Sequence, residues 1–200
     1  MKKKIITLLM TSILAASLVT GCASGNTEDN RNSDEVQTEE VKDTQEMVHL
    51  ETAEDVTAFF DELYQGVPQD MLPANIATTE LPLDDMETVT YQTGLEDLSG
   101  IEGIYLSESM IGSVAYSALY IRTNDEADAQ QLRQTLMDNI NPAKWICVTA
   151  EKQIAGVFGN DIFFVMAATD TADEVYGQAK KAAESRNMSV SEAIDRINVQ

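Results

Sequence analysis

The sequence is poor in the residues that build metal centres and activated nucleophiles. Its 200 residues include two cysteines, Cys22 and Cys147, and one histidine, His49. A structural zinc site usually takes four Cys or His ligands, and only two such residues follow Cys22. The sequence therefore excludes a structural zinc site of that kind, and we expect no metal and no cofactor.

Basic residues are also scarce. Thirteen Lys and Arg stand against 34 Asp and Glu, a formal net charge of −21. Removing residues 1–21 removes three lysines and no acid, which leaves 10 basic and 34 acidic residues and a net charge of −24. Nucleic-acid binding rests on neutralising phosphates with Lys and Arg, so this balance argues against it. It also argues against a body lying flat on anionic lipid.

Recognisable catalytic motifs are missing as well. There is no Gly-rich loop with the spacing and lysine of a phosphate-binding loop, and no second histidine to serve as the base of a serine hydrolase. Two nucleophile pairs remain as alternatives that no motif supports: His49 with Cys147, and Ser113 or Ser117 with Lys144 or Lys152. We expect a protein that is not an enzyme.

Acidic and aromatic residues offer further candidates, each with a simpler explanation. The carboxylate pairs at 84–85 and 96–97 are interpreted as solvated loop charges. The stretches LPLDDMET and TNDEADA offer oxygen ligands for calcium but lack the spaced acids and the glycine of an EF-hand loop. A ligand groove would need four aromatic residues that we assign instead to sheet packing: Tyr105, Tyr116, Tyr120 and Trp145.

The N-terminus has the pattern of a secretory signal. Three lysines (MKKK) precede an uncharged apolar run over 5–20 that is too short for a typical membrane-spanning helix. The run ends in VTGC, which resembles the bacterial lipobox, where a diacylglyceryl group is attached to the cysteine and the chain is cut before it. That resemblance implies lipidation of Cys22, and two acyl chains anchor a protein stably to a membrane.

Three regions follow from these patterns: a signal peptide over 1–21, a lipidated cysteine with an acidic tether over 22–49, and a single domain over 50–200. The stretch 23–47 has eight acids and no aromatic residue, which favours disorder. A flexible chain of that length spans about 25–30 Å. With Cys22 lipidated, Cys147 has no partner for an internal disulfide, and its apolar neighbours predict a small buried side chain.

The domain is predicted to be α+β, an antiparallel sheet with packed helices in the order α-loop-ββα-ββα. The first half is expected to hold a helix capped by Thr52 and Asp55, a packed loop over 67–85, a strand over 86–94 and strands over 101–109 and 113–123. A helix capped by Thr123 and Glu126 and a hairpin over 153–168, turning at Gly159 and Asn160, are expected to follow. The last expected elements are a helix capped by Thr171 and Glu174 and a short closing helix over 191–197. Apolar residues at both alternating sets of the 113–123 strand predict a central strand.

The stretches MIGSVAYS (110–117) and KWICV (144–148) carry a resemblance to a known family. Over about residues 50–186 the chain resembles a family of small bacterial lipoproteins known only as a domain of unknown function. The resemblance implies an extracytoplasmic α+β domain on a lipid anchor, and it supplies no catalytic residue or ligand.

Two functions from different classes are consistent with the sequence. The first is a non-catalytic interaction or accessory module of the cell envelope, held on the extracytoplasmic face of the membrane by lipid on Cys22 and engaging another envelope protein. The alternative is a lipoprotein that binds a sugar, peptide or cell-wall fragment in a pocket near MIGSVAYS and Trp145.

Overall fold

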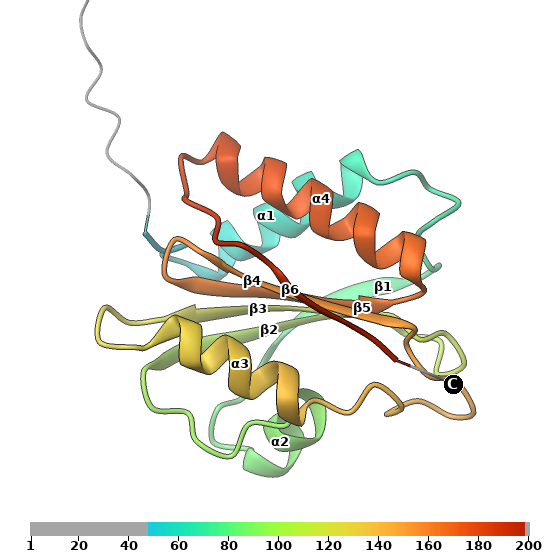
Figure 1. Ribbon diagram of the computed structural model, residues 1–200, viewed down its shortest axis with the longest axis horizontal. Coiled ribbons are helices and arrows are strands. Elements are labelled where there is room, and N and C mark those ends of the chain that lie inside the picture. The colour runs from blue at the N-terminus through green and yellow to red at the C-terminus, as the bar shows by residue number, and fades with distance from the viewer. Residues whose placement is uncertain (1–47, 199–200) are drawn as a thin grey trace, which may run out of the picture. The chain divides into compact units, whose positions relative to one another are not determined.

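The computed structural model describes residues 48–198, which form one six-stranded antiparallel sheet with two helices on each face (Figure 1). The elements in chain order are α1 (Ala53–Gly66), β1 (Ile76–Leu81), α2 (Met86–Thr93), β2 (Ile101–Ser109), β3 (Ser117–Thr123), α3 (Ala129–Asn139), β4 (Lys152–Phe158), β5 (Asp161–Ala167), α4 (Thr169–Ser185) and β6 (Ile194–Ile197). The strand order is β1-β2-β3-β5-β4-β6, so the predicted α+β class is confirmed.

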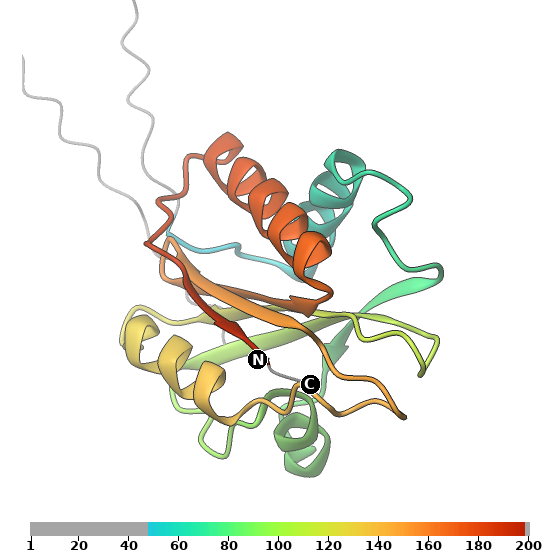
Figure 2. The same cartoon turned by 45° about the vertical axis from the view of Figure 1, so that its right-hand side comes forward.

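The sheet separates two hydrophobic cores. Helices α1 and α4 cover one face, where Phe59, Phe163 and Tyr176 belong to a cluster of packed aromatic rings. Helices α2 and α3 cover the other face, where Leu136 and Phe164 are buried. Figure 2 shows the two helix layers, one on each side of the sheet, from a second direction. Because both faces are covered, the central strands β3 and β5 are buried along almost their whole length, as predicted for the 113–123 region, although β3 begins four residues later.

Helix α1 forms as the sequence predicts. The Thr52 side chain accepts a hydrogen bond from the backbone of Asp55, whose carboxylate in turn accepts one from the backbone of Thr52, a complete capping box. The hairpin of β4 and β5 is also confirmed. Gly159 has φ of +62°, and a Cβ atom there would meet the Val48 carbonyl, so the turn needs glycine.

The region between residues 67 and 94 differs from the prediction. The expected packed loop contains β1, an edge strand, and the expected strand over 86–94 is the helix α2. Asp85 caps this helix by accepting from the backbone of Thr88, and Gly94 ends it in the left-handed conformation. These local caps outweigh the strand propensity of Val89 and its neighbours.

Both later helices begin at other residues than predicted. Asp128, rather than Thr123, caps α3 through the backbone of Gln131. Helix α4 begins at Thr169, two residues before the expected cap, and a carboxylate distant in sequence caps it: Glu151 accepts from the backbone and hydroxyl of Thr169. A side chain brought in by tertiary structure therefore replaces the local capping box that the sequence suggested.

The expected closing helix over 191–197 is instead the edge strand β6, paired with β4. The observed order is therefore αβα-ββα-ββα-β, which adds two edge strands and a helix to the predicted order. No helix within residues 48–198 is long and apolar enough to cross a membrane.

Candidate functional site

Two loops lie side by side at one end of the sheet. The loop over 110–116 joins β2 to β3, and the loop over 140–151 joins α3 to β4. The Ile146 backbone N–H donates to the Gly112 carbonyl at 3.3 Å, which ties the two loops together. We call these two loops the loop ridge. They contain the KWICV stretch and all of the MIGSVAYS stretch except Ser117, and their residues line two separate hollows.

The first hollow, here the Trp145 hollow, has a volume of about 250 Å³. It is lined by residues of α2, of the end of β2 and of the loop ridge: Tyr91, Gln92, Glu108, Ser109, Met110, Gly112, Lys144, Trp145 and Ile146. The Tyr91 hydroxyl donates to the Lys144 carbonyl at 2.7 Å, so α2 is fastened to the ridge at this point.

A buried lysine lies beneath this hollow. The Lys144 side chain is 2% exposed, and its Nζ lies 3.2 Å from the Glu108 carboxylate, 3.2 Å from Ser117 Oγ and in contact with the Gln92 amide oxygen. The Trp145 ring N–H donates to the same Glu108 oxygen at 2.8 Å. Burial lowers the pKa of Lys144, and the Glu108 charge opposes that shift.

The structure thus brings together Ser117 and Lys144, one of the candidate nucleophile pairs. A serine nucleophile needs a neutral base and an accessible hydroxyl. Ser117 is fully buried at the start of β3, and Lys144 donates to it while paired with a carboxylate. This arrangement favours a structural ion pair over an active serine. Of the other two candidates, Lys152 pairs with Asp173 and Asp195, and Ser113 lines a different hollow from Lys144.

The outer rim of the Trp145 hollow is apolar and exposed. Met110 is 73% exposed and Ile146 is 76% exposed, although both are large apolar residues. Seven large apolar side chains are exposed within residues 48–198. Three of them, Tyr91, Met110 and Ile146, line this hollow, and a fourth, Ile111, follows Met110 in the chain. Exposed apolar residues gathered at one place are typical of a binding surface.

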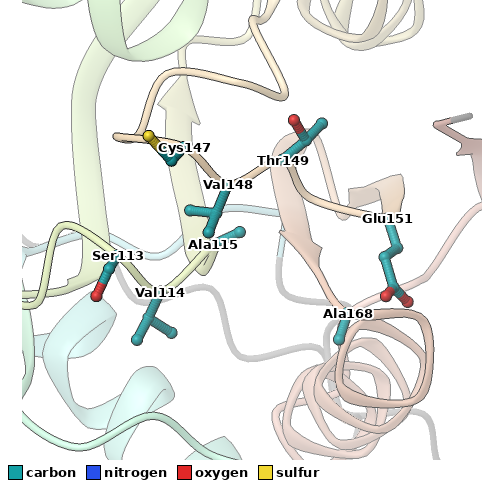
Figure 3. Close-up of a pocket in the computed structure, with 8 residues that line it drawn as sticks. All are labelled: Ser113, Val114, Ala115, Cys147, Val148, Thr149, Glu151 and Ala168. Atoms are coloured by element: carbon teal, nitrogen blue, oxygen red, sulfur yellow. The ribbon is translucent and has the colours of Figure 1, made fainter. Parts of the chain in front are cut away.

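The second hollow, here the Cys147 hollow, is lined mainly by later residues of the same two loops and has a volume of about 580 Å³ (Figure 3). Ser113 and Glu151 lie on opposite sides of it, with Ala115 and Val148 between them. Cys147 is exposed here with φ of +61°, so the prediction of a buried cysteine is wrong. The loop turns outward at this residue, which keeps the thiol out of the core.

His49 has partners other than Cys147. Its two ring nitrogens lie 3.0 Å from the Asp161 carboxylate and 3.1 Å from that of Asp125. Burial alone lowers the pKa of His49, but the hydrogen bonds and charges of both acids outweigh burial and raise it above its ordinary value. His49 and Cys147 lie near opposite ends of β5, whose length is about 20 Å, so the structure does not form the candidate Cys–His pair.

Asp161 is fully buried and is the centre of a hydrogen-bond network. One carboxylate oxygen accepts from His49 and the Thr123 backbone, and the other accepts from the Leu50 backbone and the Tyr120 hydroxyl, all at 2.9–3.0 Å. The sequence predicts that Val48 and His49 belong to the tether, but both contact the domain: His49 binds Asp161, and the Asn160 N–H donates to the Val48 carbonyl. Nothing in the sequence around Asp161 marks it as buried.

The remaining sequence candidates have structural roles. Asp85 caps α2 and Asp97 closes a turn through Ser99, as expected for loop charges. The three tyrosines of the candidate groove are buried in the α1–α4 core, whereas Trp145 packs on the opposite face, so they share no groove. Within residues 48–198 no three His, Cys, Asp or Glu side chains are grouped to hold a metal ion. Cys22 lies outside the described residues.

Sequence analysis missed the partners of Lys144. Gln92 comes from α2 and Glu108 from β2, and no short motif joins them to the KWICV stretch.

Comparisons with protein-family models, with curated proteins and with solved structures gave no match to this chain. The family resemblance and the lipidation of Cys22 stay predictions.

Proposed function

We propose that this protein is a non-catalytic interaction module of the cell envelope, anchored to the extracytoplasmic face of the membrane by lipid on Cys22. The observation that carries the proposal is the apolar rim of the Trp145 hollow, where Met110 and Ile146 are about three-quarters exposed. Keeping such side chains in water is unfavourable unless a partner covers them. The loop ridge is the surface that we assign to that partner.

The polar groups beneath the rim support a binding role without chemistry. Lys144, Glu108 and the Trp145 ring N–H satisfy one another, and Ser117 is buried. These contacts beneath the rim hold the two loops and α2 in fixed positions, and this preorganisation lowers the entropy cost of binding at the rim.

The proposal is tested by site-specific photocrosslinking in cells that express the full chain. A photoreactive amino acid at Met110 should give one adduct of discrete mass. The matched control carries the photoreactive amino acid in place of Val48, which is also exposed but lies near the other end of β3. An adduct at both positions or at neither contradicts the loop ridge as the binding surface.

The lipid anchor is tested separately. Cys22→Ser should move the protein from the membrane to the soluble fraction, and retention in the membrane would contradict the anchor.

A second candidate function has one observation in its favour. The Cys147 hollow has the volume of a small-molecule site, and Ser113, Thr149 and Glu151 offer polar groups around apolar walls. It lies beside the MIGSVAYS stretch, where the sequence placed the alternative pocket. A bound sugar, short peptide or cell-wall fragment should raise the melting temperature and protect Cys147 from a thiol reagent. A panel with neither effect would leave the interaction module as the better proposal.

A further inference from the structure

We infer that the Trp145 hollow receives an apolar side chain from a protein segment in which Lys or Arg residues flank that side chain. This inference rests on the proposed function and adds the chemistry of the partner. The hollow offers about 250 Å³, with Tyr91, Met110 and Ile146 forming an apolar rim around a polar floor that includes Glu108. This arrangement suits one inserted apolar side chain that contacts the rim, with charged neighbours that reach the carboxylate.

Charge complementarity predicts that the residues flanking the inserted side chain of the partner are basic. The one basic residue in the lining, Lys144, has a side chain that is 2% exposed and is paired with Glu108. The Glu108 side chain is 19% exposed, so a partner at the hollow meets carboxylate rather than ammonium. Acids outnumber bases by 34 to 13 in the whole chain, which gives an attractive field for a basic segment and repels an acidic one.

The position of the hollow favours a protein over the membrane. Lys144 contacts Ser117 at the first residue of β3, whereas Val48 lies beside the Asn160 turn, which contacts Thr123 at the last residue of β3. This strand is about 20 Å long. The chain from the proposed anchor therefore joins the domain at the end of β3 opposite to the hollow. A second copy of this chain is disfavoured because two such acidic bodies repel each other.

Trp145 is the only tryptophan in the sequence, so its fluorescence reports on the hollow directly. The experiment uses the mature chain with Cys22→Ser and three short tryptophan-free probe peptides, composed of Lys and Leu, of Glu and Leu, and of Lys and Ser. The Lys–Leu peptide should change the Trp145 emission with a saturable titration that weakens at higher salt. The other two peptides should give no saturable change.

Variants locate the binding. Ile146→Ser removes an exposed apolar side chain and should weaken binding of the Lys–Leu peptide by about tenfold, the loss expected for a central interface contact. Val48→Ser, the matched control at the other end of the domain, should leave the titration unchanged. Circular dichroism spectra of both variants should match that of the parent, which checks that the fold is kept.

Several outcomes would overturn the inference. Equal binding of the Glu–Leu peptide, or an Ile146→Ser variant that binds as the parent does, rules out the proposed chemistry. So does a Trp145 change produced by anionic lipid vesicles, which indicates a membrane surface, or a concentration-dependent dimer in sedimentation, which indicates a second copy. If crosslinking from Met110 succeeds while the peptide titrations fail, the partner chemistry is wrong and the proposed function stands. If crosslinking also fails, the proposed function is wrong.

Discussion

Replacing Asp161 with Asn should be among the most damaging single changes in this domain. The buried carboxylate accepts four hydrogen bonds, from the backbones of Leu50 and Thr123, the Tyr120 hydroxyl and the His49 ring. An amide keeps one oxygen and presents an NH₂ group to two donors, so at least one backbone N–H loses its acceptor. The charge opposite His49 is lost as well.

The magnitude follows from these losses. Leaving a buried N–H without its acceptor costs about 1–3 kcal/mol, and each hydrogen bond to a charged group that is weakened adds about 1–2 kcal/mol, so a total of about 3–5 kcal/mol is expected. Domains of this size have about 5–15 kcal/mol of stability in total. We expect Asp161→Asn to lower the melting temperature by roughly 10 °C, because each kcal/mol is worth about 2–4 °C at this chain length.

The assay is urea and thermal unfolding of the mature chain with Cys22→Ser, followed by circular dichroism and Trp145 fluorescence. Asp125→Asn is the matched control, since Asp125 also binds His49 but its side chain is 92% exposed. That control should change stability by no more than about 0.5 kcal/mol. If the two variants lose equal stability, the buried network is not what holds residues 48–50 to the hairpin.

Three further predictions concern other residues. The raised pKa of His49 means that its contribution to stability is complete below the pKa of the unfolded chain and is lost as pH rises through the folded pKa. Stability measured by urea unfolding should therefore fall as the pH rises above about 6.5, the ordinary pKa of histidine, and His49→Gln should flatten that slope; an unchanged slope would assign it to another group. In the same assay Glu108→Gln should cost about 1–2 kcal/mol more than Lys144→Met, because it strands a buried cation whereas Lys144→Met leaves a partly exposed carboxylate. Equal costs would contradict that pairing. Cys147 should react with a thiol reagent in the folded protein at nearly the rate seen in urea, and protection without denaturant would mean that the thiol is covered.

The sequence alone determined the elements whose signals are local and strong. Helix α1 carries its own capping box at Thr52 and an apolar stripe, and the β4–β5 hairpin carries its glycine turn. The continuous apolar pattern of β3 placed it in the middle of the sheet. The acidic balance and the VTGC stretch likewise come from the sequence by itself, and they support the proposed anchor and partner class.

Tertiary structure decided the elements and sites whose partners are distant along the chain. The edge strands β1 and β6 form because β2 and β4 offer them open edges, and Glu151 caps α4 from another element. Burial of Asp161 depends on donors from two segments distant along the chain, residues 49–50 and β3. The Trp145 hollow exists because α2, β2 and the loop ridge meet around Lys144, a juxtaposition that side-chain packing and ion pairing produce and that no periodicity or motif in the sequence encodes.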